Sequence, residues 1–199
     1  MEDIELYRPS YDEIRSYTKD ITNNILVDGF APDAIVGLLR GGAIIARAFS
    51  DEMHNCPVTT MDCDATGGVG KLKEPRIVQD ISMDIRNKDV LVCDDISERG
   101  YSLKLSYDHL DKKGPKSLKT ATIYIRKGSL FIPDYFYPKD PGDYWIVFPG
   151  EEEETIRDLM KEGKEHVLLK VFSQEEINDA MQREWLYKKA RNNKEEGIT

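Results

Sequence analysis

Apolar residues along the chain alternate between short continuous runs and stretches with helical spacing. Runs of the length typical of strands occupy residues 33–39, 58–64, 76–82, 88–95, 118–125 and 143–148. Apolar residues recur at helical spacing within residues 10–28, 43–53, 102–113, 151–163 and 173–189. This alternation with short connections predicts an α/β fold, with a mainly parallel central sheet flanked by helices.

Two of the predicted helices begin with a recognisable capping pattern. Ser10 is followed three residues later by Glu13, and Ser173 by Glu176. A serine with a glutamate at this spacing can satisfy the free N–H groups of a helix start reciprocally. The segment after Phe131 is aromatic without a clear period, and we expect it to be irregular.

The length of 199 residues is typical of one domain with an appendage. We expect one domain over residues 1–163 and a helical extension over residues 164–199 that packs on the core or on a second subunit. The formal net charge of -9 disfavours general binding to nucleic acid or to an anionic membrane. An acidic N-terminus, three cysteines without paired spacing and the lack of a long apolar run favour a cytoplasmic protein.

The run 88–95 ends in two adjacent carboxylates, Asp94 and Asp95. An isolated pair of this kind is most often a solvated loop start or a helix cap. In a parallel sheet, however, ligands gather at the carboxyl ends of the strands, and a sugar diol or Mg²⁺ would offset the repulsion between the two charges. The next loop carries serine hydroxyls and Gly100 before a predicted helix start, which favours an anion. A ribose 5-phosphate is the ligand that fits both features.

Three segments together resemble the type I phosphoribosyltransferases. "VLVCDDISERGYSL" is similar to their 5-phosphoribosyl 1-pyrophosphate (PRPP) signature, "GLLRGGAIIARAF" to their pyrophosphate-binding turn, and "DYWIVFPGE" to their purine-binding segment. The segments occur in the family's order and cover about the first 150 residues. The likeness is greatest to the enzymes for hypoxanthine, xanthine or guanine. It implies the fold of that family with a small hood, transfer of phosphoribose from PRPP to a 6-oxopurine in purine salvage, Mg²⁺ as cofactor, and a homodimer.

The resemblance also implies roles for residues of the PRPP signature. Asp94 and Asp95 would hold the ribose hydroxyls, directly or through Mg²⁺. Glu98, where the family usually has aspartate, would be the general acid or base near N7 of the purine. The 5-phosphate would be held by Ser97, Arg99, Gly100, Tyr101 and Ser102. Arg99 replaces a threonine of the family, so its guanidinium either pairs with the phosphate or fills the pocket.

The turn at residues 39–42 is implied to bind pyrophosphate. Its members are Leu39, Arg40, Gly41 and Gly42. Alone, a glycine pair is ordinary punctuation between a strand and a helix. In the resembling family the peptide bond before the arginine position is often cis, which makes Leu39–Arg40 the candidate here. The loop at residues 66–76 is either a lid over PRPP or a plain surface loop.

The purine site is implied by the third segment and by one earlier position. Trp145 would stack on the base with Ile146 beside it, although a core tryptophan is the alternative. Arg126, with Lys127 adjacent, would meet the 6-oxo group. Glu151 would join Asp95 at the metal, or is simply an acid at a helix start. A rival hypothesis is a PRPP-binding regulatory protein of the same fold with weak or no catalysis, because Arg99 and Tyr101 depart from the family pattern.

Overall fold

The computed structural model of the protein describes residues 4–66, 72–139 and 141–195. The chain divides into two compact units, one formed by Ser10–Gly142 and the other by Met1–Pro9 with Asp143–Thr199. The expected boundary at residue 163, between one domain and a helical extension, remains a proposal.

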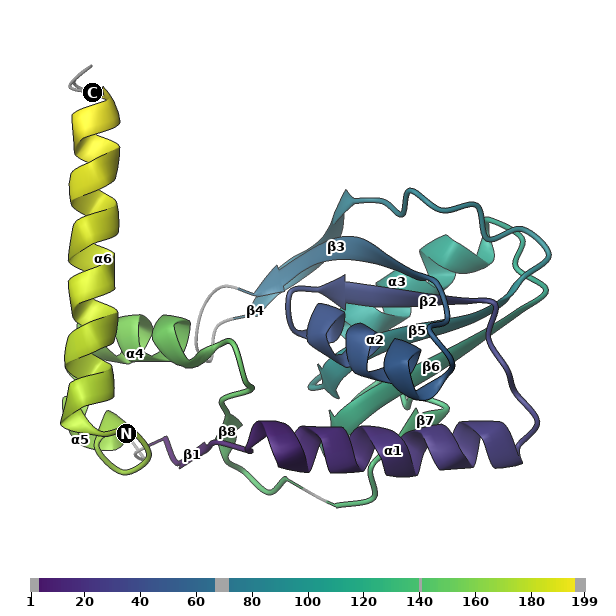
Figure 1. Cartoon of the computed structure of the whole chain (residues 1–199), viewed down its shortest axis with the longest axis horizontal. Coiled ribbons are helices and arrows are strands. Elements are labelled where there is room, and N and C mark those ends of the chain that lie inside the picture. The colour runs from purple at the N-terminus through teal and green to yellow at the C-terminus, as the bar shows by residue number, and fades with distance from the viewer. Residues whose placement is uncertain (1–3, 67–71, 140, 196–199) are drawn as a thin grey trace. The chain divides into compact units, whose positions relative to one another are not determined.

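The Ser10–Gly142 unit is built on a six-stranded sheet in the order β4-β3-β2-β5-β6-β7 (Figure 1). The strands are β2 (Ala34–Leu39), β3 (Val58–Thr66), β4 (Leu72–Gln79), β5 (Asp89–Ser97), β6 (Ser117–Ile125) and β7 (Tyr135–Phe136). All neighbouring strands run parallel except β3 and β4. The predicted α/β fold with a mainly parallel sheet is therefore confirmed.

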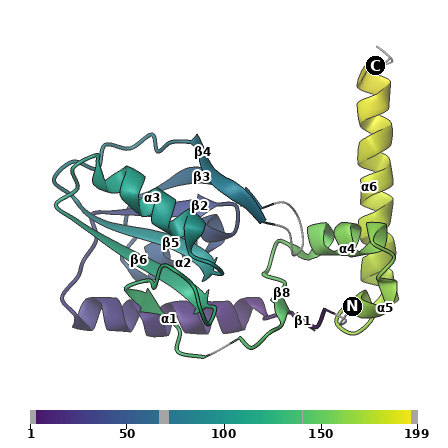
Figure 2. The same ribbon diagram turned by 180° about the vertical axis from the view of Figure 1, so that it is seen from behind.

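Helices cover both faces of this sheet. The first, α1 (Tyr11–Val27), and α2 (Gly41–Glu52) lie on one face, and α3 (Tyr101–Asp111) lies on the other (Figures 1 and 2). The predicted capping box of α1 is present, because the Glu13 N–H donates to Ser10 Oγ and the Ser10 N–H donates to Glu13 Oε2. Among the described residues, no helix combines the length and hydropathy that a membrane crossing requires.

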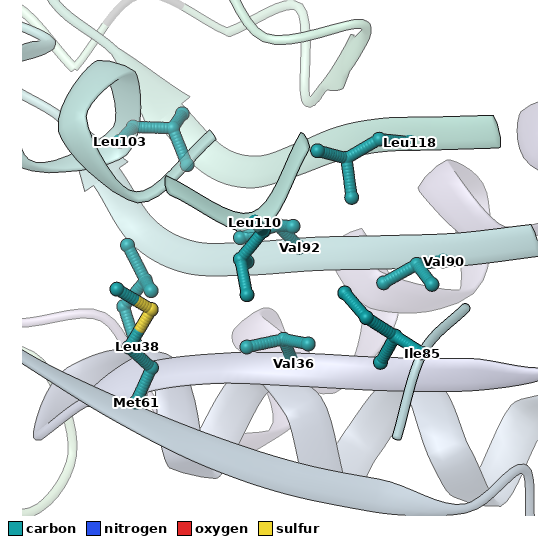
Figure 3. Close-up of a cluster of buried hydrophobic side chains, with 9 residues drawn as sticks. All are labelled: Val36, Leu38, Met61, Ile85, Val90, Val92, Leu103, Leu110 and Leu118. Carbon is teal, nitrogen blue, oxygen red and sulfur yellow. The ribbon is translucent and has the colours of Figure 1, made fainter. Parts of the chain in front are cut away.

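A compact apolar cluster fixes α3 against the sheet (Figure 3). It consists of Val36, Leu38, Met61, Ile85, Val90, Val92, Leu103, Leu110 and Leu118. Each of these residues is at most 8% exposed, and burial of one aliphatic side chain stabilises a fold by about 1.5–3 kcal/mol. The cluster holds β2, β5 and the start of α3 together, so the loops that follow β2 and β5 leave from a rigid support.

The other unit pairs the N-terminal segment with the C-terminal part of the chain. Strands β1 (Leu6–Tyr7) and β8 (Trp145–Ile146) form a small parallel sheet. Strand β8 is followed by α4 (Glu152–Lys161), α5 (Glu165–Leu168) and α6 (Gln174–Glu195). The capping box at Ser173 is present, and α6 continues past the predicted end near residue 189.

Two sequence expectations need correction at the level of single strands. The segment after Phe131 is not wholly irregular, because Tyr135 and Phe136 form β7 against β6. Strand β3 continues to Thr66 and β4 begins at Leu72, whereas the apolar runs indicate a strand that ends at residue 64 and one that begins at residue 76. Neither feature has the apolar alternation of a half-buried strand, so periodicity does not reveal it.

Arg8 ties the N-terminal segment to α4 and α6 within its unit. Its guanidinium lies 2.8 Å from Glu176 Oε1 and 3.7 Å from Glu152 Oε1, and 4.7 Å from the centre of the Phe172 ring. The Ser173 backbone N–H, followed by the Arg8 side chain, holds the pKa of Glu176 below its ordinary value. Because the folded state lowers this pKa, the stability that Glu176 contributes is present at neutral pH and is lost as the pH falls below 4.5.

Replacement of Arg8 by alanine is expected to destabilise this unit by about 1–2 kcal/mol, through loss of the ion pairs and of the contact with the aromatic ring. Both tryptophans of the chain, Trp145 and Trp185, belong to this unit, so tryptophan fluorescence during urea unfolding measures the effect. Arg47→Ala, which removes an exposed pair with Asp51, is the control and should leave the transition in place. Identical transitions for wild type and Arg8→Ala would contradict the role of Arg8.

Candidate active site

The structure brings the Leu39–Gly42 turn and the Asp94–Asp95 pair together at one edge of the sheet. Strands β2 and β5 are parallel neighbours with Gly37 opposite Cys93, so both loops leave at the same end. A Cβ atom at Gly41 would lie 1.7 Å from Asp95 Oδ2, and one at Gly42 would lie 2.6 Å from the Cys93 carbonyl oxygen. Only glycine permits this close approach of the turn backbone to the end of β5.

The peptide bond between Leu39 and Arg40 is cis. The expectation taken from the family resemblance is thus confirmed for this bond. Arg40 is exposed and immediately precedes α2. The roles of the four turn residues in binding pyrophosphate remain predictions.

Asp95 is a buried carboxylate with a like charge beside it. Its side chain Oδ1 accepts a hydrogen bond from the Ile96 N–H at 2.6 Å, and Asp94 Oδ1 accepts one from the Asp95 N–H at 3.0 Å. Burial, followed by the charge of Asp94, raises the pKa of Asp95 well above its usual range. The ionised form therefore becomes favourable when a cation or a hydroxyl donor approaches it.

Hard oxygen ligands of this kind suit Mg²⁺ when a substrate supplies further oxygens. Within residues 4–66, 72–139 and 141–195, no three histidine, cysteine or acidic side chains are grouped to hold a metal by themselves. Mg²⁺ commonly binds one or two protein carboxylates and completes its shell with substrate phosphates and water. The carboxylates of Asp94 and Asp95 fit that pattern. Glu151, the other expected ligand, belongs to the second unit, where its N–H donates to the Phe148 carbonyl.

Glu98 and Arg126 form an ion pair just beyond the ends of β5 and β6. Arg126 Nε lies 3.0 Å from Glu98 Oε2, and a terminal guanidinium nitrogen of Arg126 donates to the Gly142 carbonyl. The Arg126 side chain is only 16% exposed, whereas that of Glu98 is 54% exposed. Lys127 is exposed and makes no side-chain hydrogen bond or ion pair with the described residues. The geometry therefore favours Arg126 over Lys127 as the residue with a fixed orientation at the site.

The turn from Glu98 to Ser102, here called the phosphate turn, leads into the N-terminus of α3. Gly100 precedes the helix with a φ of 77°, a conformation that glycine adopts without strain. Arg99 is exposed, and its side chain makes no hydrogen bond or ion pair with the described residues. Whether it pairs with the phosphate or fills the pocket stays a prediction. Tyr101 is 45% exposed. The first amides of α3 are available to an anion in this arrangement.

Ser97 differs from the other residues expected to wrap the phosphate. It is 1% exposed, and its hydroxyl donates to the Phe131 carbonyl at 2.9 Å. The hydroxyl also lies 2.9 Å from Ser129 Oγ. A side chain engaged in this way holds the protein's own loop, so any contribution of Ser97 to phosphate binding acts through the backbone.

Sequence reasoning missed Ser129 and Phe131, because nothing in "GSLFIP" signals a contact with residues thirty positions earlier. It also missed the surface cavity of about 290 Å³ that adjoins this segment. Arg126 and Lys127 line the cavity together with Phe136 and other apolar residues. The Tyr137 ring on its wall is stacked on Tyr17, with 3.9 Å between ring centres.

The remaining candidates lie in the second unit or outside the described residues. Trp145 is half-buried and its backbone N–H donates to the Glu5 carbonyl at 2.7 Å, while Ile146 is 5% exposed. The predicted lid includes residues 67–71, which lie outside the described residues. The base-stacking and lid roles therefore stay predictions.

Comparison with known proteins gives one consistent result. The family model of the phosphoribosyl transferase domain matches residues 2–154. The chain is 37% identical over 137 residues to a hypoxanthine-guanine phosphoribosyltransferase of Aquifex aeolicus, covering 59% of this chain and 75% of that protein. It is 27% identical over 133 residues to the enzyme of the same name in Staphylococcus aureus, covering 64% and 74%.

Among solved structures, the chain resembles a purine phosphoribosyltransferase from Pyrococcus horikoshii. The TM-score is 0.64 at 26% identity, and the match covers 73% of this chain and 93% of the other. The sequence motifs, the sheet edge on which they meet and these likenesses agree: the chain belongs to the type I phosphoribosyltransferase family, and within it resembles the purine phosphoribosyltransferases.

Proposed function

We propose that the protein transfers the 5-phosphoribosyl group of PRPP to a 6-oxopurine and releases pyrophosphate, a reaction of purine salvage. The observation that carries the proposal is the Glu98–Arg126 pair at the same sheet edge as Asp94, Asp95 and the Gly41–Gly42 turn. An acid or base, a fixed cation and an anion-binding turn lie together there. The names of the related enzymes support purine as the acceptor class.

In the proposed reaction the C1–oxygen bond to pyrophosphate breaks, and its electron pair leaves with the pyrophosphate. A bond forms between C1 and a ring nitrogen of the purine, while Glu98 takes a proton from the base. Positive charge grows on the sugar ring in between, so the chief task of the residues is to fix geometry and exclude other nucleophiles. Mg²⁺ bound with PRPP would neutralise the departing pyrophosphate.

Arg126 supports a 6-oxo rather than a 6-amino purine. A guanidinium has five N–H donors and no acceptor, so it matches a carbonyl oxygen and leaves an exocyclic amino group without a partner. Its orientation is set by Glu98 and the Gly142 carbonyl. A site arranged to hydrogen-bond one group rejects an analogue that lacks it far more strongly than an apolar pocket does.

The proposal includes the wider features that the family resemblance implies. Asp94 and Asp95 hold the ribose hydroxyls, and Asp95 and Glu151 are the proposed metal ligands. The turn at Leu39–Gly42 holds pyrophosphate, and the amides of the phosphate turn hold the 5-phosphate. Trp145 and Ile146 contact the base. The enzyme is a cytoplasmic homodimer in this proposal, with residues 164–199 as an extension of the catalytic domain.

Initial rates of nucleotide formation with PRPP, Mg²⁺ and each of hypoxanthine, guanine, xanthine and adenine test the proposal. At least one 6-oxopurine is expected to react about 100-fold faster than adenine. Arg126→Ala should reduce this preference, and Lys127→Ala, which changes the adjacent exposed cation, should preserve it. Equal rates with adenine would overturn the base assignment. Binding of PRPP in calorimetry without turnover on any base would instead favour a regulatory protein.

A further inference from the structure

Within the phosphate turn, no side chain holds the backbone in a fixed conformation. Gly100 at the start of α3 supplies no side chain, and α3 has no side-chain cap. Neither Arg99 nor Tyr101 makes a polar side-chain contact with the described residues. A turn that binds an anion through backbone amides must hold those amides in place before the ligand arrives, because ordering them on binding reduces affinity.

The segment Ser129–Phe131, here called the brace, supplies the missing support. Its Leu130 N–H donates to the Arg99 carbonyl at 3.1 Å. A Cβ atom at Gly100 would lie 2.6 Å from the Phe131 nitrogen and 2.7 Å from Ser129 Oγ, so the brace is in close contact with the turn. The backbone of the turn is thus held from outside.

Buried hydroxyls join the brace to the end of β5. Ser97 Oγ donates to the Phe131 carbonyl at 2.9 Å and lies 2.9 Å from Ser129 Oγ. Ser129 Oγ is also 3.1 Å from the Phe131 carbonyl oxygen. The Phe131 ring packs on the core cluster and lies 5.6 Å from the Tyr107 ring of α3. The brace is therefore anchored to the same core that supports the sheet edge.

The same contacts link the phosphate turn to Arg126. The Arg126 N–H donates to the Ser97 carbonyl at 3.1 Å, and the Ser129 N–H donates to the Arg126 carbonyl at 3.0 Å. The Arg126 side chain in turn pairs with Glu98 at the head of the turn. A closed set of hydrogen bonds thus connects the group that would hold phosphate with the group that would face the base.

We propose that Ser97 and Ser129 are positioning residues, which touch neither substrate but hold the phosphate turn and Arg126 in one fixed register. The inference rests on the proposed function, because it assigns the turn to the 5-phosphate of PRPP. It goes beyond that function by giving the buried hydroxyl pair a role in substrate affinity rather than in folding alone.

The test compares Ser97→Ala with Ser50→Ala by calorimetric titration with PRPP and Mg²⁺. Ser50 is a matched control, because it is also buried in the Ser10–Gly142 unit. Its hydroxyl also donates to a backbone carbonyl, that of Cys56, at 2.8 Å. Ser97→Ala removes the hydrogen bond to the Phe131 carbonyl and the contact with Ser129 Oγ, and Ser50→Ala removes the hydrogen bond to the Cys56 carbonyl, so both variants are expected to lose thermal stability. Only Ser97→Ala should weaken PRPP binding, by about tenfold.

A second pair of variants isolates the hydroxyl contact. Ser129→Ala should weaken PRPP binding in the same way, and the double variant should lose less than the product of the two single effects because the two hydroxyls share one contact. Ser129→Thr retains the hydroxyl and should keep most of the PRPP affinity that Ser129→Ala loses. Equal PRPP affinity in Ser97→Ala, Ser50→Ala and wild type would overturn the inference. Failure of the wild type to bind PRPP would count against the proposed function instead.

Discussion

Glu98→Gln is expected to lower kcat by about 100- to 10 000-fold, the usual contribution of general acid or base catalysis, and to leave PRPP affinity nearly unchanged. The glutamine amide oxygen still accepts a hydrogen bond from Arg126 Nε, so the ion-paired geometry is largely kept. What the variant loses is the ability to take a proton from the purine. Steady-state kinetics together with PRPP titration separate the two quantities.

Asp108→Asn provides the control for Glu98→Gln. Asp108 is a partly exposed acid paired with Lys104 on α3, and its replacement should alter neither kcat nor PRPP affinity. If Glu98→Gln reduced turnover and PRPP affinity equally, Glu98 would be part of the binding surface rather than of the chemistry. Full activity of this variant would remove it from both.

Gly41→Ala is expected to weaken PRPP binding about 100-fold, because the new Cβ would overlap the Asp95 carboxylate. The added atom would lie 1.7 Å from Asp95 Oδ2 and 2.6 Å from its Cγ, so the carboxylate must move. Displacement of a positioning group by about 1 Å can cost two orders of magnitude in function. Crowding of this kind also destabilises a fold by about 1–3 kcal/mol. Calorimetric titration and thermal unfolding measure the two effects.

Gly114→Ala separates crowding at the site from a general loss of stability. Gly114 has a φ of 74°, and a Cβ added there would have no neighbour within 4 Å, so alanine strains the backbone and crowds nothing. This variant should lose stability by about 1–2 kcal/mol and bind PRPP as the wild type does. Equal PRPP affinity in Gly41→Ala and wild type would show that the glycine turn and Asp95 do not form one binding surface.

The sequence predicted those parts of the fold that strong local signals specify. The strands predicted over residues 33–39 and 88–95 are adjacent and parallel in the structure. The serine–glutamate pairs that begin at residues 10 and 173 cap helices, as predicted. The meeting of the glycine turn with the acidic pair followed from the rule that ligand loops gather at one end of a parallel sheet. Hydrophobic periodicity and turn residues were therefore sufficient to predict which loops meet at this edge of the sheet.

Features set by contacts distant in sequence were not predictable. A strand was predicted over residues 143–148, but β8 has two residues and pairs with β1, with Leu6 opposite Trp145, a pairing that no local pattern shows. The inward direction of Ser97 depends on Phe131, thirty-four residues later. The choice between Arg126 and Lys127 likewise required the position of Glu98, which only the paired ends of β5 and β6 provide.

Hydrogen–deuterium exchange with PRPP and Mg²⁺ tests the central claim most directly, because it locates the ligand without relying on catalysis or on the identity of the base. The claim is that the sheet edge after β2 and β5 binds a phosphorylated pentose. It predicts that PRPP slows amide exchange in two segments, residues 39–43 and 94–103, and that ribose 5-phosphate alone protects the second of them. Binding of PRPP that protects neither segment would contradict the account.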